Sequence, residues 1–335
     1  MITENPNAKS MQAAIFYGPR DIRVEEIPLP GIGEEEVLVQ VKACGICGSD
    51  LHFYRSGMFE DDVSRPMGNG RIMGHEFSGV VSEMGAKVKD FLIGDRITGL
   101  GMGGFAEYVP LPVNTYSSHR LPENISFEEG TTLEPLASSV HAAEVAGPAE
   151  GETVVILGAG IIGLGCLQVI RAAVACPVIV VDMSPIRLNM AEQLGADVTI
   201  NLKETDPREA VMEFTSREGK KGGAGADLVI DCAGVKSSPV QGFRMLKKYG
   251  GRLIVAALYE EQPDLDFNEF NSMNASMHAS WGWTGHDYRR AIELVQTGRV
   301  ERNLLISHEY PLKEAPAAFT TQADPEVSIK VLIKP

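Results

Sequence analysis

Two of the five cysteines lie close together in the stretch KACGICGSDLH. Cys44 and Cys47 form a CxxC, a spacing that fits three different roles. The pair can be a redox couple, half of a structural zinc site, or one catalytic metal ligand beside an unrelated neighbour. Ser49, Asp50 and His52 follow Cys47 closely, so polar groups suited to proton transfer stand next to this pair.

Further metal-ligating residue types occur later in the chain. His75 and Glu76 stand together in GHEFSGVV, and Glu134 stands in TTLEPLASSVHA. Thiolate, imidazole and carboxylate make a plausible zinc set, and a catalytic zinc uses about three protein ligands plus an open position. The separations are too long for a zinc finger, so tertiary structure must assemble such a site. Glu134, just before a proline, also suits the first turn of a helix, where negative charge is favourable.

A second candidate site is indicated by glycines in VVILGAGIIGLG. Gly158, Gly160 and Gly163 form a G-x-G-x-x-G between an apolar stretch and a helical one, with Ile161 and Ile162 inside the motif. Glycines here permit a tight turn and a close approach of a pyrophosphate to the N-terminus of the helix. The motif in this context predicts a dinucleotide site.

One acidic residue bears on whether the site would bind NAD or NADP. Asp182 ends the next apolar stretch, ~20 residues after the glycines. A carboxylate there accepts hydrogen bonds from the ribose hydroxyls and repels a 2′-phosphate, so NAD+ is the expected cofactor. The alternative is that Asp182 simply caps the helix that begins at SPIRL. Arg187 either reaches the same ribose or lies on a solvated helix face, and the sequence leaves both interpretations open.

The elements that must position these residues fall into two kinds. From Met11 to about Pro122 the chain consists of short β-like segments between Gly and Pro turns. From about Glu134 to Leu258, strand-like and helix-like segments alternate, as in a parallel α/β unit whose strands are covered on both faces. A helical stretch and the apolar strand SIKVLIKP end the chain. The sequence therefore predicts an α/β protein.

Composition narrows the class of protein and partner. The chain has 335 residues, 44% hydrophobic and 22% charged, which fits a globular protein of about two domains. Thirty basic against 45 acidic residues give 30 − 45 = −15, a charge that disfavours nucleic acid and anionic membranes as partners. Neither a membrane span nor a signal peptide is apparent. Five cysteines in a chain of this length do not suggest a disulfide framework, so the cytoplasm is the expected compartment.

The motifs together resemble the zinc-dependent medium-chain alcohol and polyol dehydrogenases. GHEFSGVVSEMGAKV resembles that family's zinc signature and CGSDLH its first-ligand turn, while GDRIT, GGFAEYV, EPLASSVHA and GAGIIG also fit. The CGSD and LEP forms resemble the sorbitol dehydrogenase branch. The resemblance implies hydride transfer between a secondary, cyclic or sugar-derived alcohol or polyol and NAD+, giving the ketone. The alternatives are an L-threonine 3-dehydrogenase-like enzyme and a non-catalytic nucleotide-binding protein that keeps only the fold.

The resemblance also implies a role for each residue of the metal set. Cys47 and His75 would be firm ligands of one catalytic Zn2+, with Glu76 and Glu134 as alternating or partial ligands. Asp50 would hydrogen-bond the distal nitrogen of His75, as is usual for a ligating histidine.

Three further residues receive roles in the same way. Ser49 would accept the proton of the substrate hydroxyl, and His52 would pass it to solvent by way of the cofactor ribose. Lys330, in SIKVL, matches a position that can reach the cofactor phosphates; the alternative is a solvated lysine on a terminal strand. Cys44 is expected to be a packed strand residue, since free cysteine is usually buried.

The fold implied by the resemblance is a Rossmann doubly wound parallel sheet, residues 136–280, and a mostly-β GroES-like catalytic domain, residues 1–135, to which residues 281–335 return. Many members carry a lobe with four cysteines and a structural zinc, but GDRITGLGMGGFAEYV contains no cysteine, so no structural zinc is expected. The expected partners are a small alcohol or ketone substrate and further copies of the chain in a homodimer or homotetramer. Two sets of aromatic residues could line the substrate pocket or belong to the core. One set, Phe53, Tyr54 and Phe59, follows Cys47, and the other, Trp281 and Trp283, lies in ASWGWTGHDY.

Overall fold

The computed structural model describes residues 10–57, 66–67, 70–217 and 223–335, and within it the chain forms two compact units. One unit, here called the β-rich unit, comprises Met1–Glu134, Ile292–Thr297 and Arg302–Pro335. The other, the α/β unit, comprises Pro135–Ala291 and Gly298–Glu301. Phe59, one of the aromatic candidates, lies outside the described residues.

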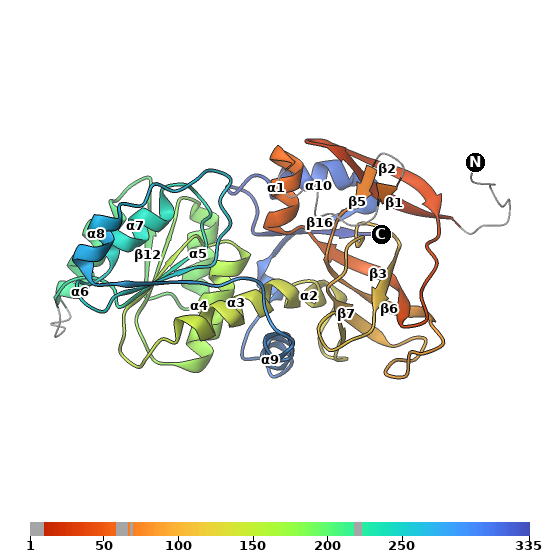
Figure 1. Cartoon of the computed structure of the whole chain (residues 1–335), viewed down its shortest axis with the longest axis horizontal. Coiled ribbons are helices and arrows are strands. Elements are labelled where there is room, and N and C mark those ends of the chain that lie inside the picture. The colour runs from red at the N-terminus through yellow and green to blue at the C-terminus, as the bar shows by residue number, and fades with distance from the viewer. Residues whose placement is uncertain (1–9, 58–65, 68–69, 218–222) are drawn as a thin grey trace. The chain divides into compact units, whose positions relative to one another are not determined.

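The β-rich unit contains two sheets (Figure 1). One has the strand order β2-β1-β5-β4; the other has the order β16-β17-β3-β6-β7-β9, with β8 paired to β3. The elements are β1 (Ser10–Gly18), β2 (Asp21–Pro28), β3 (Glu36–Gly45), α1 (Gly48–Ser56), β4 (Pro66–Met67), β5 (Gly70–Ile72), β6 (Glu76–Met84), β7 (Arg96–Gly99), β8 (Tyr108–Pro112), β9 (Ser118–Arg120), α2 (Phe127–Gly130), the 3-10 helices η1 (Asn303–Leu305) and η2 (Leu312–Glu314), β16 (Ile306–Pro311), α10 (Ala315–Gln322) and β17 (Lys330–Lys334).

The pairing of β3 with β6 is the central contact of this unit. Alternate residues of β3, Val37, Val39 and Val41, point into the apolar core, as the two-residue period of a strand requires. On the partner strand, a side chain at Gly79 would collide with the backbone carbonyl of Gln40, so only glycine lets the two strands approach this closely. Because this pairing is fixed, the residues at the ends of both strands are fixed as well.

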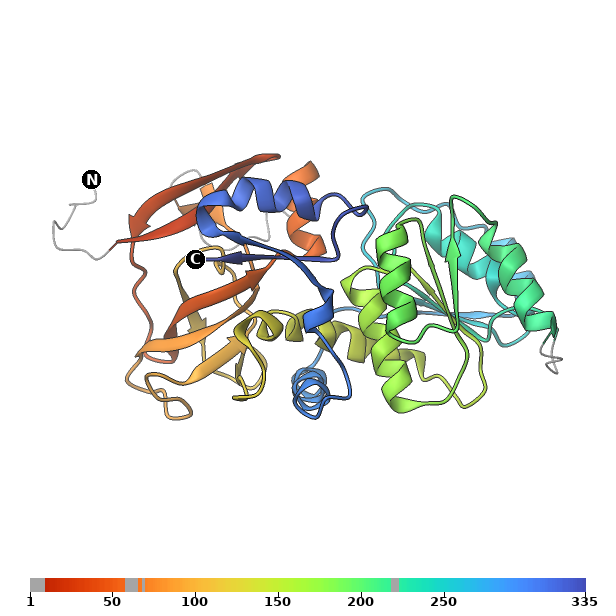
Figure 2. The ribbon, with the colours of Figure 1, turned by 180° about the vertical axis from the view of Figure 1, so that it is seen from behind.

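The α/β unit is built on a six-stranded parallel sheet of order β12-β11-β10-β13-β14-β15, with helices on both faces (Figures 1 and 2). Its elements are β10 (Val154–Leu157), α4 (Ile161–Ala173), β11 (Val178–Asp182), α5 (Pro185–Gln193), β12 (Val198–Asn201), α6 (Pro207–Arg217), β13 (Leu228–Asp231), α7 (Ser238–Met245), β14 (Arg252–Val255), α8 (Phe267–Met273) and β15 (Ser276–Ala279). Two helices run across the unit boundaries, α3 (Leu133–Ala146) and α9 (Gly285–Gln296).

The strands β10, β11 and β13 consist almost wholly of buried apolar residues, as expected where helices cover both faces. The order of the strands reverses between β10 and β13, and doubly wound sheets bind their ligands at the carboxyl ends of strands at such a reversal. The predicted parallel α/β sheet is therefore confirmed. Among the described residues, no helix is long and apolar enough to cross a bilayer.

Candidate functional site

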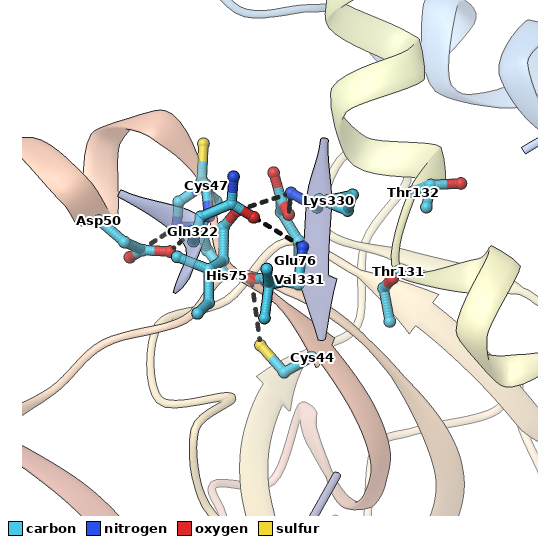
Figure 3. Close-up of polar contacts among 12 residues, drawn as sticks. Cys44, Cys47, Asp50, His75, Glu76, Thr131, Thr132, Gln322, Lys330 and Val331 are labelled. Carbon is cyan, nitrogen blue, oxygen red and sulfur yellow. Dashed lines mark hydrogen bonds and ion pairs between the residues drawn. The ribbon is translucent and has the colours of Figure 1, made fainter. Parts of the chain in front are cut away.

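The pairing of β3 with β6 brings the two metal motifs together. Gly45, the last residue of β3, pairs with Glu76, the first residue of β6. Cys47 follows β3 by two residues and occupies the N-cap position of α1, while His75 directly precedes β6. One donor atom from each of Cys47, His75 and Glu76 lies within 4.8 Å of the others, and Figure 3 shows the three side chains converging. The cysteine and the histidine–glutamate pair therefore form one cluster.

Asp50 orients this cluster from the first turn of α1. Its Oδ2 accepts a hydrogen bond from the backbone N–H of Cys47 at 2.9 Å. Its Oδ1 lies 3.8 Å from Nδ1 of His75, which is an ion-pair distance and too long for the hydrogen bond that the sequence predicted. Because Nδ1 faces this carboxylate, Nε2 of His75 is the nitrogen left to bind a metal.

Lys330 is the partner of Glu76. It is fully buried, and its Nζ donates to Oε2 of Glu76 (Figure 3). The same Nζ also donates to the Ile46 carbonyl at 2.9 Å. Burial lowers the pKa of this lysine, but Glu76 and Cys47 raise it more, so the net shift is upward and the lysine is charged. The interpretation of Lys330 as a solvated lysine is wrong, because β17 is covered on both sides; its contact with the cofactor phosphates stays a prediction.

Gln322, in α10, holds the strand that carries Lys330. Its Oε1 accepts from the backbone N–H of Val331 at 2.6 Å, and its Nε2 donates to the carbonyl of Ile329 at 3.3 Å. The amide thus binds the backbone on both sides of Lys330. No pattern in the sequence marked Gln322, since a helix-to-strand contact of this kind has no local motif.

One carboxylate oxygen in the cluster fits a bound cation. Glu76 is fully buried, Lys330 occupies Oε2, and Oε1 has no hydrogen-bond partner among the described residues. A buried carboxylate oxygen without a partner is costly. Burial and the charge of Glu76 also raise the pKa of the Cys47 thiol, so a metal is needed to make it a thiolate ligand at neutral pH. The donor set of sulfur, imidazole and carboxylate suits zinc.

Glu134 lies in the first turn of α3, where the helix dipole favours a negative charge. Burial is the largest single effect on the pKa of His75 and of Lys330, and it lowers both values. The charge of Glu134 is among the effects that raise them. Glu134 is not one of the three residues whose donor atoms converge within 4.8 Å. Glu134 therefore lies close enough to act electrostatically on the cluster. This position is compatible with a role as a partial metal ligand and with a role as a carboxylate at the N-terminus of a helix.

Ser49 and His52 lie on α1, directly after the cysteine ligand candidate. Residues three apart share a helix face, so these two side chains are neighbours along one side of α1. Both are partly exposed, as residues that exchange a proton with solvent must be. Their participation in proton transfer stays a prediction.

Cys44 is distinct from Cys47 although only two residues separate them. It lies in β3, is fully buried, and its Sγ donates to the Gly45 carbonyl at 3.8 Å. Burial raises the pKa of this thiol well above its ordinary value. Redox-active pairs need a thiol of lowered pKa, so the geometry favours a packed residue over a redox couple.

The glycine turn is shaped for close approach by a ligand. A side chain at Gly158, where φ is +88°, would lie 2.8 Å from Cα of Ala233, and one at Gly163 would collide with the Gly158 carbonyl. Gly160 caps α4 without a side-chain hydrogen bond, and the nearest atom to a Cβ there would be Nη1 of Arg187 at 3.8 Å. A ligand would therefore meet little crowding at Gly160, beside the N–H groups that the first turn of α4 leaves without intrahelical partners, which fits a phosphate.

Asp182 is held beside this turn. Its Oδ2 accepts from the N–H of Ala159 at 2.6 Å, and its Oδ1 accepts from Met183 and Ser184 at 2.7 and 2.8 Å. It therefore stabilises the turn before α5, as the capping interpretation has it, and also links β11 to the glycine turn. A carboxylate has about four acceptor positions, so one is left for a ribose hydroxyl. Arg187 reaches toward Gly160, which places its guanidinium at the turn and off a purely solvated face.

The aromatic candidates have separate surroundings. Phe53 is buried in the apolar core, and the ring of Tyr54 lies 5.2 Å from that of Phe319. Trp283 is buried against Tyr288, with 4.9 Å between the centres of the two rings, whereas Trp281 is 72% exposed. Trp283 is therefore a core residue, and Trp281 lies on the surface of its unit.

Comparisons with known proteins agree with this geometry. The alcohol dehydrogenase GroES-like domain model matches residues 33–123, and the zinc-binding dehydrogenase model matches residues 162–297. The sorbitol dehydrogenase of Bos taurus is 30% identical, over 96% of this chain and 95% of its own length. The predicted GroES-like domain beside the Rossmann-type sheet is thereby confirmed.

Two solved structures extend the comparison. The 2R,3R-butanediol dehydrogenase of Bacillus subtilis is 28% identical, with a TM-score of 0.84 over 97% of this chain and 100% of its own. A zinc-binding dehydrogenase of Sinorhizobium meliloti, solved with NADP, is 30% identical, with a TM-score of 0.84 over 98% of this chain and 100% of its own. These similarities support a zinc site and a nicotinamide cofactor.

The two cysteines of the CxxC give a direct test of the metal cluster. Cys47→Ser should lose most of the zinc of the wild-type protein, because a hydroxyl is a far poorer zinc ligand than a thiolate. Cys44→Ser is the matched control and should keep about one zinc per chain, since Cys44 packs in β3. The measurement is elemental analysis after gel filtration. Equal zinc loss in both variants would contradict the assignment of Cys47 alone.

Proposed function

Because the chain belongs to the zinc-dependent medium-chain alcohol and polyol dehydrogenase family, we propose that it oxidises a secondary alcohol or polyol to the ketone with NAD+. The observation that carries the proposal is the cluster of Cys47, His75 and Glu76, in which the buried Oε1 of Glu76 has no hydrogen-bond partner among the described residues and would be satisfied by a cation. The physiological substrate is proposed only as a class, because specificity depends on pocket shape and a few polar contacts.

We propose that one zinc per chain is held by Cys47 and His75, with Glu76 and Glu134 as alternating or partial carboxylate ligands. When bound, zinc supplies a Lewis acid that polarises the C–O bond and lowers the pKa of the substrate hydroxyl. Asp50 fixes the ring orientation of His75, and Lys330 holds Glu76 by its other oxygen. We propose no structural zinc, since residues 94–109 contain no cysteine.

The cofactor residues divide by the part of NAD+ that they would bind. The nicotinamide supplies the hydride acceptor. Gly158, Gly160 and Gly163 let the pyrophosphate approach the N-terminus of α4, with Ile161 and Ile162 supplying its first turn. Asp182 would accept from the ribose hydroxyls, and Arg187, beside Gly160, would lie near the same end of the cofactor.

Proton removal is assigned to the exposed side of α1. Ser49 would accept the hydroxyl proton and His52 would release it to solvent, with the two side chains on one helix face. The amino-alcohol alternative is not favoured, since the relatives named above are polyol and alcohol dehydrogenases by name.

We further propose that the chain acts as a homo-oligomer in a reducing compartment such as the cytoplasm. The five cysteines, all within the described residues, form no disulfide with one another, which suits that compartment. Strand β15 is the last strand of the parallel sheet, and within the described part of the chain it pairs only with β14. Met277 in this strand is 40% exposed and Trp281 just after it is 72% exposed. An edge strand with exposed apolar residues is a surface at which a second copy can pair.

The first test of function is a screen of secondary alcohols and polyols that follows NADH formation. Active substrates should be found, and Ser49→Ala should lower kcat roughly 100-fold on the best of them, because proton transfer by a positioned group is lost. Ser216→Ala, an exposed serine on α6, is the control and should match the wild type. Full activity of Ser49→Ala with zinc retained would remove Ser49 from the mechanism.

Cofactor choice is tested at Asp182. Asp182→Asn should lower the ratio of kcat/KM for NAD+ over NADP+ by roughly tenfold, because the charge that repels a 2′-phosphate is removed. Glu150→Gln, an exposed glutamate of the same unit, should leave the ratio unchanged. An unaltered ratio in the Asp182 variant would mean that this carboxylate only supports the turn.

The oligomer is tested by light scattering after gel filtration. Trp281→Glu should shift the protein toward the monomer mass, since a charge replaces an exposed ring beside the edge strand. Leu92→Glu, an exposed apolar residue of the β-rich unit, should keep the wild-type mass. A monomeric wild-type protein would refute the proposal.

A further inference from the structure

The carboxyl edge of the parallel sheet has two halves. The glycine turn after β10 and Asp182 at the end of β11 occupy one half, where the adenosine part of NAD+ would bind. On the other side of the reversal, β13 and β14 end at the edge where the nicotinamide part would lie. The turns that follow these two strands therefore bound the reactive end of the cofactor, an inference that rests on the proposed function.

These two turns are joined through Asp231, the last residue of β13. Its Oδ2 accepts from the hydroxyl of Tyr259, in the turn after β14, at 2.6 Å. The same oxygen accepts from Oγ of Ser238 at 2.7 Å, and Oδ1 accepts from the N–H of Ala233 at 3.0 Å. The backbone of β13 adds a bond, from the N–H of Ala256 to the Asp231 carbonyl at 3.0 Å. Among these bonds, Tyr259 supplies the side-chain link between the turns. An exposed ion pair between Lys236 and Asp264, at 2.9 Å, also joins the two segments.

The turns also touch directly. Gly234, in the turn after β13, has φ of +68°, and a Cβ there would lie 2.6 Å from the carbonyl oxygen of Leu258. The backbones of Gly234 and Leu258 are thus so close that only glycine fits at position 234. Leu258 directly precedes Tyr259. A small displacement of Tyr259 would therefore move both turns.

The chemistry of the link favours a firm contact. Asp231 is fully buried, and burial raises its pKa while the bonds from Tyr259 and Ser238 oppose that shift. Burial and the charge of Asp231 raise the pKa of the Tyr259 hydroxyl, so the hydroxyl keeps its proton and stays a donor. Hydrogen bonds to a charged acceptor in a buried setting are the stronger ones.

We propose that Tyr259 is a positioning residue for the nicotinamide half of the cofactor site: by donating to Asp231 it holds the turn after β14 against the turn after β13. Tyr259 itself forms no hydrogen bond with the glycine turn or with Asp182 among the described residues, although Ala233 in the turn after β13 packs against Gly158. No motif of the sequence pointed to it.

The test compares two probes of different reach. In Tyr259→Phe, the Kd of NADH should rise roughly tenfold through the loss of one charge-assisted hydrogen bond, while the Kd of AMP, which reaches only the adenosine half, should not change. A purely structural role would weaken both probes together. Isothermal titration of the zinc-loaded full chain measures both constants.

Two control variants sharpen the result. Tyr249→Phe, with a 65% exposed ring, should bind both probes like the wild type. Ser238→Ala removes another donor to the same oxygen but leaves the link between the turns, so its effect on NADH should be smaller than that of Tyr259→Phe. Hydrogen–deuterium exchange of Tyr259→Phe should increase in peptides covering 232–237 and 256–260 and stay constant over 158–163.

The outcomes separate the two proposals. If the wild type binds both probes and Tyr259→Phe binds NADH unchanged, or loses both probes equally, the positioning role is overturned and the proposed function stands. If the wild type binds NADH but oxidises no alcohol, the proposed function is overturned. The comparison of NADH and AMP binding then still decides the role of Tyr259. A wild type that binds neither probe overturns both.

Discussion

Among the described residues of the β-rich unit, Glu76 and Lys330 form a fully buried ion pair beside the β3–β6 pairing. Taking two charges out of water is expensive, and their attraction offsets this only when the remaining polar atoms are also satisfied. Lys330 meets that condition by donating to the Ile46 carbonyl, and Gln322 fixes the strand around it. Glu76 does not, since Oε1 is left without a partner among the described residues. The ion pair thus fixes the carboxylate rigidly and leaves one oxygen directed at the cysteine and histidine.

In the α/β unit, two buried carboxylates fix the turns that follow their strands. Asp182 and Asp231 each end a strand of the parallel sheet, and each accepts backbone N–H groups of the turn that follows. Asp182 links its strand to the glycine turn, and Asp231 links its strand to the turn that carries Tyr259. Two carboxylates at equivalent positions therefore organise the two halves of one edge. Each turn is shaped by an acceptor that the strand itself supplies.

Local motifs were readable from the sequence because their physics is local. The glycine turn needs three glycines within one strand–turn–helix, and that pattern is visible without knowing the fold. The metal motifs were likewise predicted as a set, although Asp50 faces His75 at 3.8 Å without a hydrogen bond. The partner of Glu76 was missed because it lies 254 residues away, and only the register of β17 brings it there. The signal was a lysine between apolar neighbours in SIKVL, which fits a solvated edge strand equally well.

The balance of charge in the cluster explains why metal binding and folding should be linked. Glu76, Asp50 and Glu134 act on the same small region, and Lys330 is the cation paired with Glu76 there. Burial raises the pKa of both Cys47 and Asp50. A divalent cation held by Cys47, His75 and Glu76 would favour the thiolate form of Cys47. Because the unfolded chain does not present these donors together, the free energy of metal binding adds to the stability of the β3–β6 pairing that assembles them.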